Sequence, residues 1–159
     1  MNFRIGFGYD VHRLEEGIPF WLGGIEIAHH KGSVGHSDAD VLLHAICDAI
    51  LGAAALGDIG THFPDSDQTY RGIASTILLQ KTGELLASGG YEIGNIDSTI
   101  CLQTPRVKPY IPQMQKEIAK QLGLQEGQVS IKATTEEKLG FTGREEGVSA
   151  YAVVLIRSL

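Results

Sequence analysis

The pattern of apolar and polar positions predicts strands at both ends of the chain, with helices between them. Strands are expected at residues 3–12, 91–103, 129–135 and 148–157, and a hairpin at residues 19–28. Helices are expected from an N-cap at Ser37 or Asp38 to about Leu56, and over residues 73–87 and 112–122. Loops or short turns are expected at residues 29–36, 61–71 and 137–143.

This order of elements predicts one α+β domain spanning residues 1–159, in which a mixed β-sheet carries helices on one face as a two-layer sandwich. A chain of 159 residues is long enough to bury an independent core. Residues 151–156 of the last predicted strand are apolar on both faces. Such a strand is covered twice, and we expect a neighbouring subunit to provide the second cover.

Two short segments concentrate the side chains that bind divalent metals. Asp10 and His12 share one face of a strand, and His44 shares a helix face with Asp40 and Asp48. If the strand packs on that helix, Asp10, His12 and His44 converge on one ion and leave a coordination position open, as in catalytic zinc sites.

Other residues of the two segments keep alternatives open. His36 and Asp38 can replace one of these ligands or form hydrogen bonds to them, and Asp38 fits equally well as an N-cap. Asp48 lies one helical turn beyond His44, where a carboxylate can accept a hydrogen bond from the metal-bound imidazole.

Three loops carry further candidate chemistry. Residues 57–65 contain acids bounded by glycines, and residues 105–109 form a stiff basic loop that could meet an anion. Residues 132–144 join two hydroxyls, two acids and a glycine-rich turn with an arginine. Hydroxyls and backbone N–H groups at a strand end can hold phosphate, and a carboxylate can hold Mg²⁺ against it.

Composition narrows the function classes. The net charge of −6 argues against a nucleic-acid partner. No apolar stretch is long enough for a membrane span, and the first residues lack the features of a signal or transit segment. Cys47 and Cys101 are expected to be buried free thiols. We therefore expect a cytoplasmic protein of a bacterium, or a plastid protein whose leader has been removed.

The chain contains no P-loop, HExxH or GxSxG motif, and Gly6 to Asp10 fails as a dinucleotide fingerprint because a strand continues where a helix should begin. No pair of nucleophile and base is evident. These observations favour phosphate chemistry achieved by positioning and metal ions over covalent catalysis.

Taken together, these segments resemble the 2-C-methyl-D-erythritol 2,4-cyclodiphosphate synthase family over essentially the whole chain. The resemblance is carried by Gly8-Tyr-Asp10-Val-His12, His36-Ser-Asp38-Ala-Asp40-Val-Leu-Leu-His44, residues 51–60, Phe63-Pro-Asp65, Ile111-Pro-Gln-Met114 and residues 132–144. It implies a homotrimer with active sites between adjacent subunits. The implied reaction belongs to non-mevalonate isoprenoid synthesis: a 4-diphosphocytidyl-methylerythritol 2-phosphate is cyclised and CMP is released.

The resemblance also implies roles for individual residues. Asp10, His12 and His44 would bind Zn²⁺ or another divalent cation, and Glu137 would contribute to a Mg²⁺ or Mn²⁺ site. The catalytic residues would be Thr135, His36 and Asp48. The substrate contacts would be His36, Ser37, Asp58, Gly60, Phe63, Asp65, Thr104, Pro105, Arg106, Lys108, Thr134, Thr135, Phe141 and Arg144.

Two positions depart from the family pattern. Members often have Ala-Pro-Lys where this chain has Thr104-Pro105-Arg106 in the loop that wraps cytosine. Some members place an acid near the trimer axis where Tyr151 stands, in a cavity, shared with Arg144, that is proposed to hold isoprenoid diphosphates. The resemblance therefore does not extend to that ligand.

Two rival functions remain at this point. A metal-dependent phosphohydrolase would use the same ligands to activate water, and it would release inorganic phosphate or a linear product without CMP. A trimeric nucleotide-sensing module would bind cytidine nucleotides without turnover. Product analysis with the cytidyl substrate separates the three.

Overall fold

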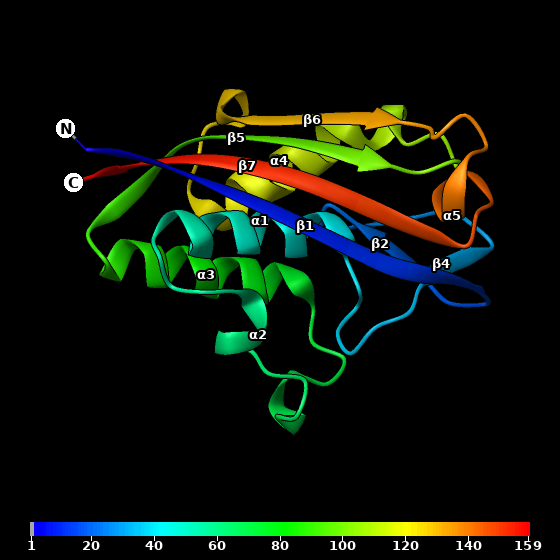
Figure 1. The fold of residues 1–159 in the computed structure, drawn as a ribbon, viewed down its shortest axis with the longest axis horizontal. Helices are drawn as coiled ribbons and strands as arrows, with labels where there is room; N and C mark the ends of the chain where they lie inside the picture. The colour runs from blue at the N-terminus through cyan, green and yellow to red at the C-terminus, as the bar shows by residue number, and fades with distance from the viewer. Residues whose placement is uncertain (1) are drawn as a thin grey trace.

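The computed structural model describes residues 2–159 and has one large mixed sheet (Figure 1). Its strands follow the order β4-β1-β7-β5-β6, in which β5 and β6 run parallel and the other neighbours antiparallel. These strands are β1 (Phe3–Glu16), β4 (Lys31–Ser33), β5 (Tyr91–Cys101), β6 (Val129–Thr134) and β7 (Gly147–Ser158). The predicted hairpin forms a separate pair, β2 (Phe20–Leu22) with β3 (Ile25–Ile27).

Helices α1 (Val41–Ala53), α3 (Ser75–Ser88) and α4 (Ile111–Leu122) lie on one face of this sheet. The short helix α2 (Ile59–His62) contacts α1, and α5 (Gly140–Gly143) contacts β7. The 3-10 turns are η1 (Gln68–Tyr70), η2 (Lys108–Tyr110) and η3 (Glu126–Gln128). Helix α1 packs on β1 and β7, α4 packs on β6, and α3 packs on α1. The predicted α+β class with a mixed sheet is confirmed. Within the described residues no helix is long and apolar enough to cross a bilayer.

Helix α1 is the centre of the core. Ten of its thirteen residues are buried because the sheet covers one side and α3 the other. Leu42, Leu43, Ile46 and Ile50 are fully buried, and each such side chain contributes roughly 1.5–3 kcal/mol by leaving water. Cys47 and Cys101 are buried and free, as the sequence predicts.

Two glycines set the distance between α1 and β1. A Cβ at Gly6 would lie 1.8 Å from the carbonyl oxygen of Ala49, and one at Gly8 would lie 1.9 Å from that of Ala45. No other residue permits this approach, because any side chain would overlap the helix backbone. The helix therefore rests on the strand immediately beside Asp10 and His12.

The N-cap of α1 is Asp40, so the prediction of Ser37 or Asp38 is wrong. The Asp40 carboxylate accepts hydrogen bonds from the backbone N–H groups of Leu43 (3.1 Å), Gly23 (2.9 Å) and Gly24 (2.7 Å). Burial raises the pKa of this fully buried carboxyl, although the three backbone donors act in the opposite direction. Asp40 thus ties the β2–β3 turn to the start of α1, a role that only the tertiary fold creates.

Several predicted boundaries differ from the observed ones. Strand β1 continues past His12 to Glu16 because residues 14–16 pair with β4, which lies in the predicted loop 29–36. Helix α1 ends three residues before Leu56, and α3 begins two residues after residue 73. The predicted turn at residues 137–143 contains α5.

Candidate metal centre and active-site cleft

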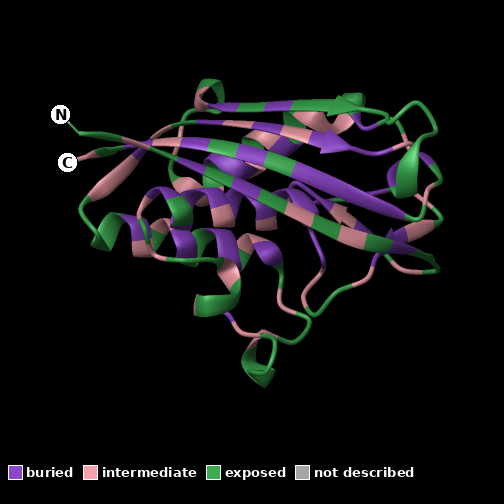
Figure 2. Cartoon of the chain, viewed as in Figure 1, coloured by how far each residue is buried: buried purple, intermediate pink, exposed green. Residues whose placement is uncertain are grey.

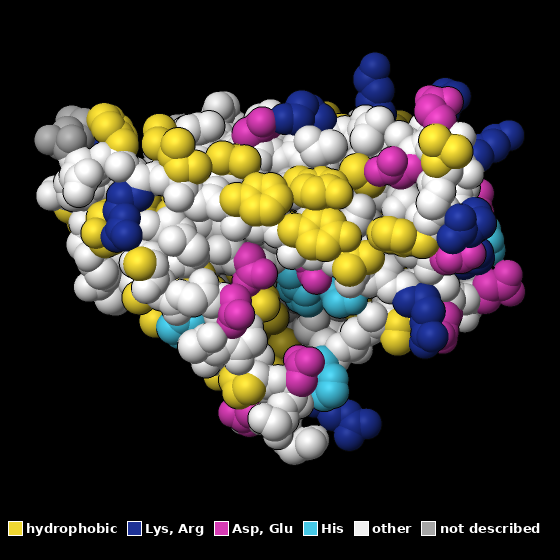
Figure 3. Space-filling view, in the orientation of Figure 1, with side chains coloured by type: hydrophobic (Ala, Val, Ile, Leu, Met, Phe, Trp, Pro, Cys, Tyr) yellow, Lys and Arg dark blue, Asp and Glu magenta, His cyan; other side chains and the backbone are white. Residues whose placement is uncertain are grey.

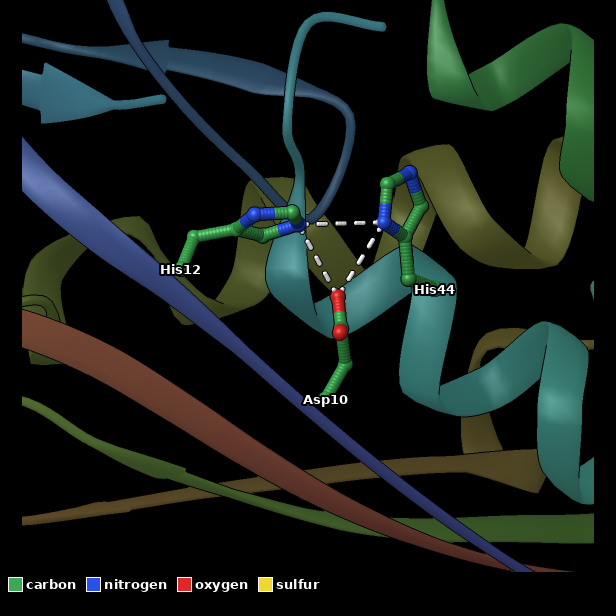
Figure 4. A group of neighbouring side chains, drawn as sticks. All are labelled: Asp10, His12 and His44. Atoms are coloured by element: carbon green, nitrogen blue, oxygen red, sulfur yellow. Dashed lines mark hydrogen bonds and ion pairs between the residues drawn. The ribbon is translucent and has the colours of Figure 1, made fainter. Parts of the chain in front are cut away.

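Three side chains from two elements meet at one point, as Figure 4 shows. Asp10 and His12 project from the helix-facing side of β1, and His44 projects toward them from the second turn of α1. The Asp10 Oδ2 atom lies 3.0 Å from His12 Nε2 and 3.1 Å from His44 Nδ1, and the two ring nitrogens are 3.2 Å apart. The convergence predicted from their spacing is present.

This triangle of donor atoms fits a tetrahedral zinc ion. Ligands about 2.0 Å from a tetrahedral ion lie about 3.3 Å from one another, close to the distances observed. The Nδ1 atom of His12 is 3.1 Å from the backbone carbonyl oxygen of Val34. Because a carbonyl only accepts, Nδ1 carries the proton and Nε2 keeps its lone pair for an ion. Two imidazoles and one carboxylate leave a fourth position for another ligand.

The pKa shifts of Asp10 and His44 show that the site favours positive charge. Burial by itself would raise the pKa of Asp10, but hydrogen bonds and charge from His12 and His44 outweigh it and lower this pKa to about 2. Burial would likewise lower the pKa of His44, yet its hydrogen bond and charge interaction with Asp10 raise it. The carboxylate therefore stays ionised and attracts a cation.

The triangle opens into a cleft of about 640 Å³. Its wall contains eight residues predicted to bind metal or substrate: Asp10, His12, His36, Ser37, His44, Gly60, Phe63 and Asp65. Tyr70, Ile73 and Leu78 add apolar surface that the sequence did not indicate. In Figure 3 the hollow lies below the apolar strands, bordered by histidine and acidic side chains.

A second, smaller hollow of about 140 Å³ holds another part of the predicted site. It is lined by Pro105, Arg106 and Lys108 of the predicted cytosine loop and by Thr134 and Thr135 at the end of β6. No residue lines both hollows. One chain therefore carries the predicted site in two separate halves.

The remaining predicted contacts lie around these halves. Asp58 caps α2 by accepting hydrogen bonds from Thr61, and it is exposed. Glu137 is exposed, and its N–H lies 3.4 Å from the Thr135 hydroxyl. Arg144 forms an exposed ion pair with Glu146 at 2.8 Å. Phe141 is 39% exposed on α5, and Thr104 precedes the hollow-lining Pro105.

Asp48 does not accept a hydrogen bond from the His44 imidazole, so that prediction is wrong. Its Oδ1 instead accepts the N–H of Ile59 at 2.7 Å, which fixes the start of α2. The Nε2 atom of His44 faces the hydroxyls of Ser75 (3.0 Å) and Ser37 (3.1 Å). Helical spacing placed Asp48 on the correct face, but the loop after α1 folds back and occupies its carboxylate.

Ser75 is the residue of the site that sequence reasoning missed. It is the first residue of α3, it is fully buried, and its hydroxyl also contacts Asp38. A serine at a helix start is ordinary, so nothing in the local sequence signals that it reaches a ligand 31 positions away.

The face of the sheet opposite the helices is apolar and open. Exposed apolar side chains alternate along β1 and continue onto β7 (Figures 2 and 3). We call this set the outer apolar patch; its members are Phe3, Ile5, Phe7, Tyr9, Val11, Tyr151 and Val153, each at least 40% exposed. Tyr9 and Tyr151 pair across the two strands with ring centroids 5.0 Å apart. Contiguous apolar surface of this kind marks an interaction site.

Comparison with known proteins gives one consistent family. The YgbB family model matches residues 3–157. The chain is 62% identical over 154 residues to the 2-C-methyl-D-erythritol 2,4-cyclodiphosphate synthase of Porphyromonas gingivalis, covering 97% of this chain and 95% of the relative. It is also 62% identical over 156 residues to the enzyme of that name from Bacteroides fragilis, covering 98% of each.

Solved structures share the fold over almost the whole chain. The bifunctional IspDF of Campylobacter jejuni superposes with a TM-score of 0.96 at 41% identity, covering 99% of this chain and 43% of that one. A 2C-methyl-D-erythritol-2,4-cyclodiphosphate synthase in its CDP-bound form superposes with a TM-score of 0.90 at 35% identity, covering 97% of this chain and all of the other.

Proposed function

The chain belongs to the YgbB family, and from this membership we propose that its cleft performs the reaction after which its relatives are named. The substrate is 4-diphosphocytidyl-2-C-methyl-D-erythritol 2-phosphate, and the products are 2-C-methyl-D-erythritol 2,4-cyclodiphosphate and CMP. The reaction is a step of the non-mevalonate isoprenoid pathway. The observation that carries the proposal is the triangle of Asp10, His12 and His44 at the base of a cleft walled by His36, Ser37 and Asp65.

The chemistry needs no nucleophile from the protein. An oxygen of the 2-phosphate attacks the β-phosphorus, a new P–O bond forms, and the bond from the β-phosphorus to the bridging oxygen breaks as CMP leaves. The attacking oxygen is anionic at neutral pH, so a general base is unnecessary. Holding both phosphates in one site supplies proximity, which is worth roughly 7–11 kcal/mol in well-oriented intramolecular reactions.

Different residues contact different parts of the substrate. His36 and Ser37 hold the 2-phosphate end and Asp65 the methylerythritol hydroxyls, while Thr134 and Thr135 donate hydrogen bonds to the diphosphate. Asp58 and Gly60 hold the ribose, and the loop from Thr104 to Lys108 surrounds cytosine. Asp10, His12 and His44 would hold Zn²⁺, and Glu137 would hold Mg²⁺ or Mn²⁺; such ions would supply positive charge against the phosphates.

We infer that each active site is completed by a second copy of this chain in a homotrimer. The cleft and the hollow that holds Thr134 and Thr135 share no residue, although one substrate must contact both. The outer apolar patch offers the surface for association, because a second chain would remove its seven exposed side chains from water. In the proposed closed trimer, the hollow of one copy would lie beside the cleft of the next and complete it.

The direct test is incubation with the cytidyl substrate and Mg²⁺, followed by phosphorus NMR. The expected result is equal release of CMP and the cyclic diphosphate. Inorganic phosphate or a linear product without CMP would identify a phosphohydrolase instead. Binding of cytidine nucleotides without turnover would identify a sensing module. The relatives named above are bacterial proteins, and we expect the reaction in the cytoplasm.

A further inference from the structure

We propose that Ser75 and Asp38 are positioning residues that accept the Nε2 proton of His44 and so hold its ring with Nδ1 facing the metal centre. This inference rests on the metal centre of the proposed function. It concerns residues outside the ligand triangle, and it assigns Asp38 a role other than helix capping or direct ligation.

The three side chains form a continuous chain of hydrogen bonds leading away from the ion. The Nε2 atom of His44 lies 3.0 Å from the Ser75 hydroxyl, which in turn hydrogen-bonds to Oδ1 of Asp38. The other carboxylate oxygen, Oδ2, accepts the backbone N–H of Ser75 at 2.9 Å. Both contacts join Asp38 to the first residue of α3, and the hydroxyl between them is fully buried.

The direction of each hydrogen bond follows from the acceptor at its end. An ionised carboxylate accepts and does not donate, so the single hydroxyl proton of Ser75 points to Asp38. The Ser75 oxygen is then available to His44 only as an acceptor. His44 must therefore donate from Nε2. Nδ1 is then the ring nitrogen left to bind an ion, and it is the atom facing Asp10 and His12.

Ser37 cannot impose the same direction. Its hydroxyl oxygen lies 3.1 Å from His44 Nε2 and accepts the N–H of Ala39 at 3.1 Å. Its hydroxyl oxygen also lies 3.4 Å from that of Ser75. Among the described residues no carboxylate accepts the Ser37 proton, so this proton is not fixed in one direction, and Ser37 lies in the wall of the cleft where it can turn to substrate. The pair formed by Ser75 and Asp38 differs from Ser37 in both respects, because the Ser75 hydroxyl is buried and the Asp38 carboxylate is a fixed acceptor for its proton.

Backbone hydrogen bonds hold Asp38 in place. The N–H of Asp38 donates to the carbonyl oxygen of Ile73 at 3.1 Å, so its main chain is bonded to the segment that leads into α3. The second imidazole, His12, is oriented by one acceptor, the backbone carbonyl of Val34. Each imidazole therefore has a hydrogen-bond acceptor on the side away from the ion, an arrangement that raises the basicity of a metal-bound histidine.

The test compares three full-length variants with the wild type. Ser75→Ala removes the hydroxyl. In Asp38→Asn the amide oxygen keeps the backbone N–H of Ser75, so the amide nitrogen faces the hydroxyl and turns its proton toward His44. Ser98→Ala is the matched control, because Ser98 is also buried and donates one hydrogen bond to a carbonyl oxygen, 3.0 Å away, but it lies on β5 away from the cleft.

Two measurements separate positioning from folding. NMR of the zinc-loaded proteins reports how fast the Nε2 proton of His44 exchanges with water, and competition with a chromogenic chelator gives the zinc affinity. We expect slow exchange in the wild type and faster exchange in both Ser75→Ala and Asp38→Asn. Zinc affinity should fall about 10- to 100-fold in both variants and stay unchanged in Ser98→Ala. Ser75→Thr, which keeps the hydroxyl, should restore wild-type affinity.

The proposal is overturned if folded Ser75→Ala keeps the wild-type proton exchange and zinc affinity, or if Ser98→Ala loses zinc equally. Should Ser75→Ala fail to fold, Asp38→Asn decides the matter, and unchanged exchange and zinc affinity in that variant contradict the proposal. Failure of the proposed function looks different: the wild type itself would not bind zinc or release CMP.

Discussion

At the scale of single residues, the charge of Asp10 controls the metal centre. Its carboxylate is 26% exposed and lies between two imidazoles. Burial acts to raise its pKa, but hydrogen bonds and charge interactions with His12 and His44 outweigh this effect, and the pKa falls from 3.8 to about 2. These interactions act in the folded chain, so the residue predicted to bind the ion also contributes to stability.

We expect the metal-free protein to lose stability through Asp10 as the pH falls from about 4 to about 2. The folded pKa is below the unfolded value, so the contribution is present above pH 3.8 and is lost on approach to pH 2. Its size is about 2 kcal/mol in the free energy of unfolding. Urea unfolding at several pH values measures it. Asp10→Asn should lack this part of the pH dependence, and an identical slope in both proteins would contradict the assignment.

Glu137 is predicted to serve a different cation from the zinc ligands. Replacement of its carboxylate in Glu137→Gln should raise the Mg²⁺ or Mn²⁺ concentration needed for half-maximal activity, because the amide carries no charge to hold a hard cation. Zinc content should be unchanged. Glu136→Gln, at the neighbouring acid, is the matched control. Activity is titrated against Mg²⁺ and Mn²⁺, and zinc content is measured by atomic absorption. The same metal dependence in both variants would contradict the prediction.

At the scale of elements, the contact between α1 and β1 determines the geometry of the centre. His44 lies on the helix, while Asp10 and His12 lie on the strand, so the ligand distances depend on how closely the two elements pack. Gly6 and Gly8 allow the helix backbone to touch the strand. The glycines are therefore part of the metal site, although neither can bind an ion through a side chain.

Gly8→Ala should weaken zinc binding as well as folding. The added Cβ would lie 1.9 Å from the carbonyl oxygen of Ala45, so α1 must move away from Asp10. Overpacking of this kind costs about 1–3 kcal/mol or more, and zinc affinity should fall with it. Gly127→Ala is the control, since a Cβ there meets nothing within 4 Å. Thermal unfolding and chelator competition test the prediction, and equal effects at both positions would refute it.

At the scale of the whole molecule, the outer apolar patch is the feature that a single chain does not explain. Phe7 is a member of this patch on β1; its side chain is 62% exposed and lies beside Tyr151 on β7. The helix face of the same sheet is buried within the chain, so this second apolar face is available for association with identical chains.

Phe7→Asp should dissociate the proposed trimer, because it places a charge within an apolar contact. Sedimentation or light scattering should then report a monomer. Activity should be lost, while the zinc ligands, on the other face of β1, stay intact. Ile77→Asp on α3 is the control, since Ile77 is 42% exposed outside the patch. A trimer that survives Phe7→Asp with full activity would show that association uses another surface.

Mixed trimers test whether two chains share one active site. His44→Ala disables the cleft, and Thr135→Ala removes a predicted catalytic residue of the second hollow. If each site takes its halves from adjacent chains, unfolding and refolding the two inactive variants together should restore part of the activity, because some sites then receive both intact halves. Each variant refolded alone is the control. No recovery from mixtures that form trimers would place both halves within one chain.

Much of the candidate site was accessible from the sequence because its ligands follow short periodicities. Asp10 and His12 are two residues apart on a strand, and His44 lies in a strongly apolar helical pattern. The side of the strand and the side of the helix that carry the ligands were therefore predictable. The same local reasoning failed for Asp48 and for the N-cap of α1. Their hydrogen-bond partners, Ile59 and the glycines of the β2–β3 turn, reach them only through the folded chain.

The sequence by itself determined the class of fold, the elements that carry the ligands and the family of the protein, since periodicity and motifs act over a few residues. The tertiary structure decided which side chains meet: the 3.0–3.2 Å triangle, the separation of cleft and hollow, and the Ser75–Asp38 pair behind His44. These depend on packing between residues far apart in the chain. The close approach of α1 to β1 sets the triangle, and no local sequence pattern encodes any of these distances.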